Sequence, residues 1–212
     1  MTQTPAPSAQ SAAPDARTPG APPAVRPAAG RLPVLVRSAS SILTAQRQGF
    51  LRAGPHPFTH SLAAYTGCAF GATTCGLYCY AAHLPNWTYG RPSPQTPWGG
   101  AVIVKENAAA LLEKELGTLR PDARRRLRIL MSASTDPYQP LEASWRLTRR
   151  CLEVFAQYDD LDLLLIQTRG PLVMRDYDLL AALPYAVLSL TVETDDAAYL
   201  RALRGGRCRP SA

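Results

Sequence analysis

Residues 127–168 read LRILMSASTDPYQPLEASWRLTRRCLEVFAQYDDLDLLLIQT, and in them two short apolar runs flank a longer segment of helical periodicity. The runs at 127–131 and 163–168 are rich in leucine and isoleucine, as buried strands are. The apolar residues that recur at helical spacing between the runs are Leu147, Cys151, Val154 and Phe155. This pattern predicts a helix over residues 141–158, and therefore a strand–helix–strand unit of a parallel sheet.

The same alternation continues on both sides of this unit. Further strands are predicted at residues 61–66, 101–105 and 187–192, and further helices at 107–116, 172–183 and 195–203. Counting these segments gives about five βα units within a core of residues 60–203. The fold class is therefore predicted to be α/β with a parallel sheet, and polar residues follow each strand at the edge where such sheets bind ligands.

The flanking segments differ in composition from this core. Residues 1–32 are rich in proline, alanine and serine and are predicted to be a disordered leader. Residues 33–59 mix short apolar pieces with polar residues, which suggests an extended arm over the core, and residues 204–212 are expected to be a frayed tail. The sequence has no run of eighteen apolar residues, so no membrane association is expected. Because its start does not resemble a secretory signal, a cytoplasmic location is expected.

The net charge of +7 is unevenly distributed along the chain. Residues 1–59 hold a surplus of five positive charges, and the rest of the chain holds a surplus of two. A nearly neutral body gives no clear track for phosphate groups, so charge alone does not indicate nucleic-acid binding.

Three of the five cysteines, Cys68, Cys75 and Cys79, crowd into one glycine-containing loop after the first predicted core strand. In a reducing compartment this crowding favours a metal site over disulfides. Three thiolates on a [4Fe–4S] cluster would leave one iron with an open coordination position. A zinc site is the alternative, because Cys75, Cys79 and His83 lie four residues apart and could share a helix face with Cys68 nearby. Chance clustering also stays open, and Cys151 is expected in the core.

Residues 58–80, FTHSLAAYTGCAFGATTCGLYCY, resemble the cluster loop of radical S-adenosylmethionine (SAM) enzymes of the spore photoproduct lyase-like family, typically N-P-Y-x-G-C-x-x-x-C-x-Y-C-Y-A. The spacing here is C-x₆-C-x₃-C instead of C-x₃-C-x₂-C, which indicates an insertion in the loop. The likeness covers roughly residues 40–203, and its further blocks are residues 131–142, 147–153, 166–169, 171–176 and 188–195. The resemblance implies a partial (βα)₆-type barrel. Since about five units are present, the chain is expected to be truncated at its C-terminus, unless its reading frame has shifted near Leu203 or the core closes with help from elsewhere.

This resemblance also implies a function and a set of site residues. Cys68, Cys75 and Cys79 would bind [4Fe–4S], and the open iron would bind SAM. Reduction by a protein such as flavodoxin or ferredoxin would cleave SAM and release a 5′-deoxyadenosyl radical, as in a lyase of this kind. The cofactor-binding residues that the resemblance suggests are Tyr78, Tyr80, Ser134, Thr135, Asp136, Arg169 and Ser189.

Alternatives remain for several of these residues and for the function. Ser134, Thr135 and Asp136 would also suit a turn before Pro137. Lys105 and Asn107 end the predicted second strand, where related enzymes bind the SAM amino group, and Asn107 would equally suit a helix N-cap. Repair of a DNA photoproduct is permitted but not required, so DNA is only a possible partner. A zinc- or cluster-bearing binding module without turnover, or a truncated relic, is the alternative function.

Overall fold

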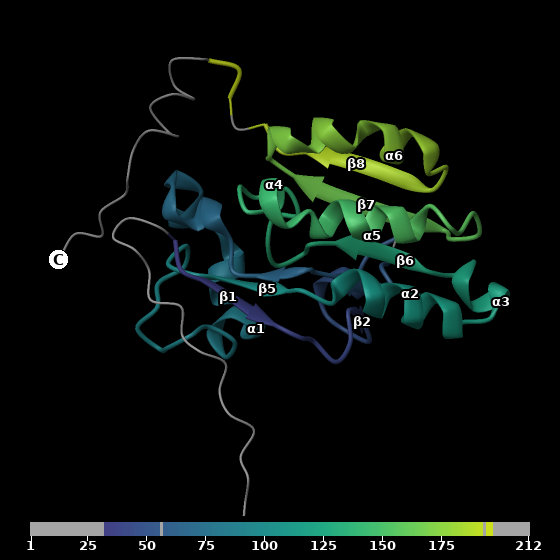
Figure 1. Cartoon of the computed structure of the whole chain (residues 1–212), viewed down its shortest axis with the longest axis horizontal. Coiled ribbons are helices and arrows are strands. Elements are labelled where there is room, and N and C mark those ends of the chain that lie inside the picture. Colours follow the sequence, from purple (N-terminus) through teal and green to yellow (C-terminus); the bar gives the residue numbers. More distant parts are fainter. Residues whose placement is uncertain (1–31, 56, 193, 197–212) are drawn as a thin grey trace, which may run out of the picture.

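The computed structural model describes residues 32–55, 57–192 and 194–196, which form a mixed α/β fold (Figure 1). The α/β prediction is therefore confirmed. Apart from Leu32, the predicted leader lies outside the described residues, as do the predicted tail and all but the first two residues of the predicted helix 195–203. In the described part of the chain, no helix is long and apolar enough to cross a bilayer.

The larger of two sheets contains the segment quoted first. Its strand order is β2-β3-β6-β7-β8. The strands β3, β6, β7 and β8 run parallel to one another, and β2 is antiparallel to β3. Their bounds are Leu43–Ala45 (β2), His60–Leu62 (β3), Arg128–Met131 (β6), Leu163–Thr168 (β7) and Ala186–Leu190 (β8). The three strands predicted from residues 127–131, 163–168 and 187–192 are confirmed, with shifts of one or two residues at their ends.

The smaller sheet corrects the expectation of one parallel sheet. Its order is β1-β5-β4, with bounds Val34–Arg37 (β1), Val102–Lys105 (β5) and Tyr65–Thr66 (β4). β5 is parallel to β1 and antiparallel to β4. The predicted strand 61–66 is thus divided between the two sheets, and the described strands do not close into a barrel. Two residues between β3 and β4 bond to Lys105 of the smaller sheet, so the chain leaves the larger sheet there. Ala64 O accepts a hydrogen bond from the Lys105 backbone N–H at 3.0 Å, and Ala63 O accepts one from Lys105 Nζ at 2.8 Å.

Residues 33–59 contribute more than an arm. They supply strands β1 and β2, one for each sheet, and a 3₁₀ turn, η1 (Phe50–Arg52), lies between β2 and β3. Ile42, just before β2, is buried in the core. These residues are extended, as expected, and they pair with core strands.

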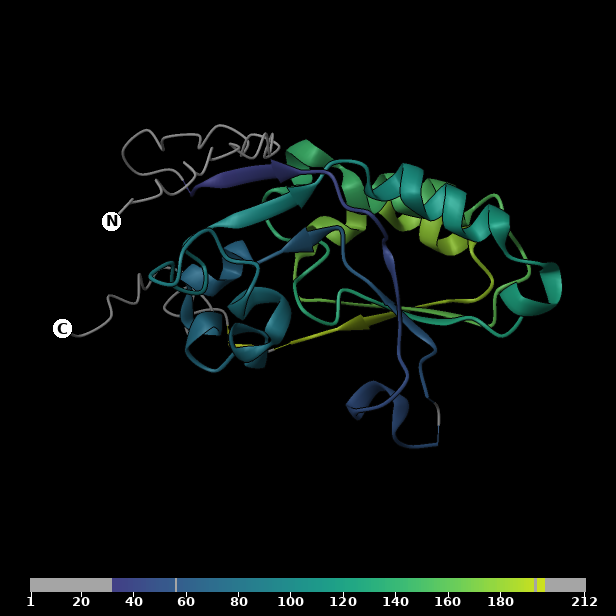
Figure 2. The same cartoon turned by 90° about the horizontal axis from the view of Figure 1, so that it is seen from below.

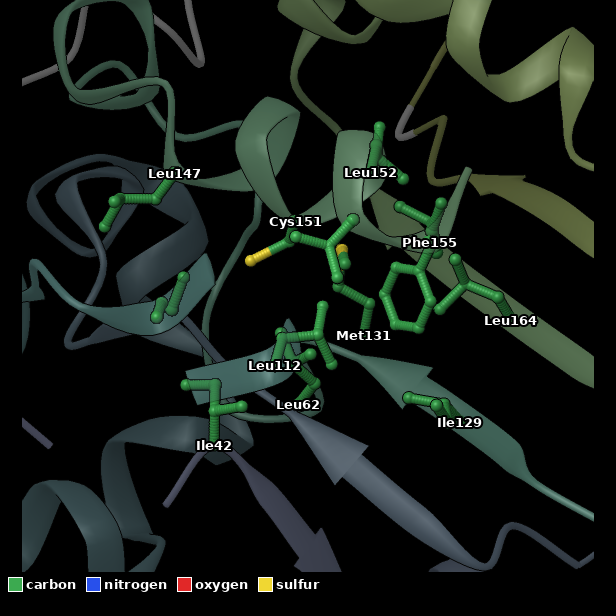
Figure 3. Packing of buried hydrophobic residues seen from close by; sticks show 14 of the residues in the cluster. Ile42, Leu62, Leu112, Ile129, Met131, Leu147, Cys151, Leu152, Phe155 and Leu164 are labelled. Atoms are coloured by element: carbon green, nitrogen blue, oxygen red, sulfur yellow. The ribbon is translucent and has the colours of Figure 1, made fainter. Parts of the chain in front are cut away.

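Three helices, α2 (Ala108–Thr118), α5 (Leu147–Phe155) and α6 (Tyr177–Ala182), lie on one side of the larger sheet (Figures 1 and 2). Leu112 of α2 and Phe155 of α5 pack over Leu62, Ile129 and Leu164 of the strands (Figure 3). Cys151 is fully buried in the same cluster, as its helical position predicts. Each fully buried leucine or phenylalanine contributes about 1.5–3 kcal/mol, so this cluster is the main source of stability.

The single helix predicted over residues 141–158 is wrong, because the chain breaks at Arg146. Two helices form, α4 (Glu142–Trp145) and α5, and Arg146 between them takes a left-handed conformation with φ 52°. The buried Glu142 carboxylate accepts hydrogen bonds from the backbone N–H groups of Thr148 (3.0 Å) and Arg149 (3.2 Å). These donors belong to the first turn of α5, where N–H groups lack helical partners. The carboxylate therefore caps α5 and stabilises the break.

The remaining helical segments are short. The predicted helix 172–183 is a 3₁₀ segment, η5 (Pro171–Asp176), followed directly by α6. Two further single-turn helices are α1 (Pro85–Thr88) and α3 (Pro121–Arg124). Both begin with proline at the first helical position, which its fixed φ favours.

Candidate functional site

The cysteine loop follows β4 and consists of three successive 3₁₀ turns. These are η2 (Ala69–Ala72), η3 (Thr74–Leu77) and η4 (Tyr80–His83). Cys68 and Cys79 lie in extended backbone directly before η2 and η4, and Cys75 lies within η3. The cysteines and His83 therefore do not share one face of an α-helix, which was the geometric basis of the zinc alternative.

The three cysteines line one cavity of about 260 Å³. The cavity lies beyond the carboxyl ends of β4, β6, β7 and β8, the edge at which the sequence predicts a ligand site. Of the other predicted site residues, those that line it are Tyr78, Tyr80, Thr135, Asp136 and Arg169. Ser134 and Ser189 are half-buried and line neither this cavity nor the larger one beside it. The fold thus brings together eight of the ten predicted residues.

The thiols differ in their readiness to ionise. Burial raises the pKa of the Cys68 thiol to about 11. A hydrogen bond from Cys75 lowers the pKa of Cys79 to about 6, and the same bond raises the pKa of Cys75. The positive charge of Arg169 opposes the rise at Cys75 and assists the fall at Cys79. The cavity therefore stabilises a thiolate at Cys79, and thiolates are the form in which cysteines bind metals.

Asp136 connects two strand ends at the cavity. Its Oδ1 accepts hydrogen bonds from Thr168 Oγ1 at 2.6 Å and from the Tyr138 backbone N–H at 2.8 Å. Its Oδ2 accepts the backbone N–H of Arg169 at 3.0 Å. Burial raises the pKa of Asp136. The turn that the sequence offered as an alternative is thus present, and the carboxylate also lines the cavity.

Lys105 and Asn107 lie away from the cysteines. Because β5 is antiparallel to β4, the end of β5 at Lys105 points back toward Ala64, whereas β4 leads to Cys68. The Asn107 side chain does not cap its own helix and instead pairs with the Ala39 backbone, accepting from N–H and donating to C=O, both at 2.9 Å. The structure therefore corrects the expectation that these two residues end beside the cofactor.

Residues that sequence reasoning missed also contribute to the site. Gln139 is fully buried and bonds to the backbone of the cysteine loop. Trp98 lines the cavity, and its Nε1 is buried without a hydrogen-bond partner among the described residues. Ser132 directly follows β6 at the cavity and has a left-handed conformation with φ 68°, which is rare for a residue other than glycine. Of these three residues, only Ser132 lies at a polar strand end of the kind that the sequence analysis used to predict the site.

Three thiols form the donor set of the cavity, the ligand type that iron–sulfur clusters take. Within residues 32–55, 57–192 and 194–196, no three His, Cys, Asp or Glu side chains are placed to hold a single metal ion. Zinc needs four ligands within about 2.0–2.3 Å of one centre, and His83 is exposed. In an iron–sulfur cluster each thiolate binds a different iron, so its sulfurs stand further apart. The unpartnered Nε1 of Trp98 also offers a hydrogen bond to a sulfur acceptor.

A larger cavity of about 780 Å³ adjoins the first. The two cavities share Phe70, Cys75, Arg169 and Thr191. The larger one is lined mainly by apolar side chains from η2, η5 and the end of β8. Its volume lies within the range of small-molecule sites. The cysteine cavity therefore opens beside a space that can hold an organic ligand.

Comparisons with known proteins give relatives without an assigned activity. The chain is 31% identical over 129 residues to an uncharacterized protein of Methanocaldococcus jannaschii, covering 60% of this chain and 42% of that protein. It is 34% identical over 125 residues to an uncharacterized protein of Mycobacterium tuberculosis, covering 59% of this chain and 34% of that one. The chain thus spans less than half the length of these relatives. No family model matches the chain. No solved structure matches it.

Proposed function

We propose that this chain is a radical SAM iron–sulfur protein in which Cys68, Cys75 and Cys79 hold a [4Fe–4S] cluster. The observation that carries the proposal is that three thiols from one loop line a single cavity at the carboxyl ends of parallel strands. We further propose that the larger sheet is part of a partial barrel of the radical SAM type. Four parallel strands with helices on one side are consistent with such an arrangement.

When a [4Fe–4S] cluster is bound, the chemistry it supplies is the one-electron reductive cleavage of SAM, which yields methionine and a 5′-deoxyadenosyl radical. The chain's own residues bind and orient the reactants and exclude water. Arg169 borders both cavities, where its guanidinium suits a carboxylate such as that of SAM. The apolar wall of the larger cavity would keep water from the reacting atoms.

Anaerobic reconstitution tests the proposal. Supplied with iron and sulfide, the chain should take up about four irons and four sulfides and show a brown chromophore. With dithionite and SAM it should then release 5′-deoxyadenosine. Replacing any one of Cys68, Cys75 or Cys79 by alanine should abolish the cluster. Cys151→Ala is the matched control, because that thiol is buried in the core and lies outside the cavity lining.

Two results would overturn parts of the proposal separately. Stoichiometric zinc with no iron–sulfur chromophore would reject the cluster. A cluster without 5′-deoxyadenosine formation would instead favour a binding module or relic. Action on a DNA photoproduct is a finer proposal, which repair of an irradiated thymine oligonucleotide would test, and inactivity there would leave the cluster proposal intact.

A further inference from the structure

Gln139 is a polar side chain with no exposure to solvent, in the loop between β6 and α4. Its Oε1 accepts the backbone N–H of Ala69 at 2.8 Å. Its Nε2 donates to Thr135 Oγ1 at 3.2 Å and, more weakly, to the carbonyl of Gly67 at 3.5 Å. A buried side-chain amide is stable only when its polar atoms form hydrogen bonds, and the partners of Gln139 are the backbone of the cysteine loop and Thr135.

The two backbone groups that Gln139 contacts lie on either side of Cys68. Thr135 Oγ1 strengthens this attachment by donating to the same Gly67 carbonyl at 2.6 Å. Gly67 itself has φ +82°, and a Cβ there would lie 2.6 Å from Ala101 O. The peptide groups before and after Cys68 are therefore both fixed, and they determine where its side chain starts.

The other two cysteines are held differently. The loop beyond Cys79 is attached through Tyr80, whose hydroxyl donates to the Ala133 carbonyl. Cys75 lies within the turn η3, six residues after the segment that Gln139 holds. The turns η2 and η3 pack closely on each other, since a Cβ at Gly76 would lie 1.9 Å from Gly71 O, and the hydrogen bonds of Gln139 and Thr135 attach the start of the loop at Cys68 to the segment after β6.

We propose that Gln139, assisted by Thr135, is a positioning residue that fixes the Cys68 sulfur relative to those of Cys75 and Cys79. This inference rests on the proposed function, because the purpose of the placement is to let three thiolates bind one cluster. Gln139 acts through the backbone of Gly67 and Ala69 and does not itself bind iron. Its loss should affect Cys68 selectively among the three cysteines.

The test compares Gln139→Ala and Gln139→Glu with the wild-type chain, first without iron. Alkylation by iodoacetamide is followed at each cysteine by mass spectrometry. Freed from its attachment, Cys68 in Gln139→Ala should react about tenfold faster, with little change at Cys75 and Cys79. Gln139→Glu keeps an acceptor for the Ala69 N–H and should show a smaller increase. The control is Gln157→Ala, an exposed glutamine just after α5, which should leave all three rates unchanged.

The same variants are then reconstituted with iron and sulfide under argon. Gln139→Ala should bind less than half the iron of the wild type and show an altered electron paramagnetic resonance spectrum. Unchanged Cys68 alkylation together with unchanged iron content would overturn the inference. If Gln139→Ala fails to fold, as judged by circular dichroism, Gln139→Glu and Thr135→Val carry both comparisons. A wild-type chain that binds no cluster would reject the proposed function, whereas the alkylation rates would still decide whether Gln139 holds Cys68.

Discussion

Arg175 Nη2 lies 2.8 Å from Oε1 of Glu142, the completely buried first residue of α4. Glu142 also accepts the hydroxyl of Tyr65, the residue that begins β4. One side chain therefore connects η5, the first turn of α5 and the strand that leads into the cysteine loop. Every oxygen of this buried carboxylate has a partner, which is the condition under which such a charge is tolerated.

Replacing Glu142 by alanine should lower the free energy of unfolding by about 3–5 kcal/mol, because Arg175 and the α5 donors lose their acceptor. Urea denaturation followed by circular dichroism measures the change. Glu153→Ala is the control, since Glu153 pairs with Arg149 at 3.2 Å on the surface and should contribute only about 0–1 kcal/mol. Equal losses for the two variants would contradict the capping role of Glu142.

Asp176 makes stability depend on acidity. Burial alone would raise the pKa of Asp176, but hydrogen bonds from Arg175 (2.7 Å) and Arg149 (2.9 Å) outweigh it and lower the pKa below the usual value. A depressed folded-state pKa contributes stability that is complete above the unfolded value of about 3.9 and is lost as the pH falls through the folded value. We therefore expect Asp176→Asn to be less stable than the wild type at pH 7. The difference should shrink below about pH 4 in urea titrations, and a constant difference would refute the linkage.

The sequence predicts what is local and misses what depends on distant contacts. The strand at residues 163–168 is found with its bounds, because a short apolar run needs no further information. The break at Arg146 is missed, since helical periodicity continues across it and only the Glu142 carboxylate explains why the chain turns. The direction of β5 relative to β4 is missed for a similar reason, because the apolar pattern of a strand is the same whether its neighbour runs parallel or antiparallel.

The same distinction applies to the candidate site. Spacing and resemblance identified the three cysteines, and the polar ends of the strands identified Thr135, Asp136 and Arg169. Trp98 gave no signal, and Gln139 was only one residue of the matched block 131–142, because each contacts the cysteine loop from more than twenty residues away in the sequence. Ser189 lies within β8, where successive side chains point to opposite faces, and Ser134 lies in the turn after β6, whose course the sequence does not predict.

Trp98→Phe should shift the reduction potential of the reconstituted cluster. Its buried Nε1–H has no partner among the described residues and borders the cysteine cavity, so a sulfur of the cluster would be its acceptor. Hydrogen bonds to sulfur favour the reduced, more negative state. Loss of one bond worth about 0.5–1.5 kcal/mol should lower a one-electron potential by about 20–65 mV. Redox titration would show this shift, and Tyr89→Phe, at an exposed ring, should leave the potential unchanged.

Gly67→Ala should both destabilise the chain and impair the cysteine loop, through backbone strain and through steric overlap of the added Cβ. Gly49→Ala is the comparison that has backbone strain without the overlap. Both glycines have positive φ, +82° and +86°, so alanine should incur a conformational cost of about 1–2 kcal/mol at Gly67. The cost at Gly49 should be about 1–3 kcal/mol, because its ψ of −172° places it in a region that is adopted almost only by glycine. Around Gly49 the space is open, whereas a Cβ at Gly67 would meet Ala101 O at 2.6 Å and the Trp87 ring at 2.8 Å. Steric overlap adds about 1–3 kcal/mol, which gives about 2–5 kcal/mol for Gly67→Ala in urea denaturation. Because the displaced segment precedes Cys68, iron uptake should fall in Gly67→Ala and stay normal in Gly49→Ala. Equal stability and equal iron content in the two variants would contradict the close packing of the loop against Ala101.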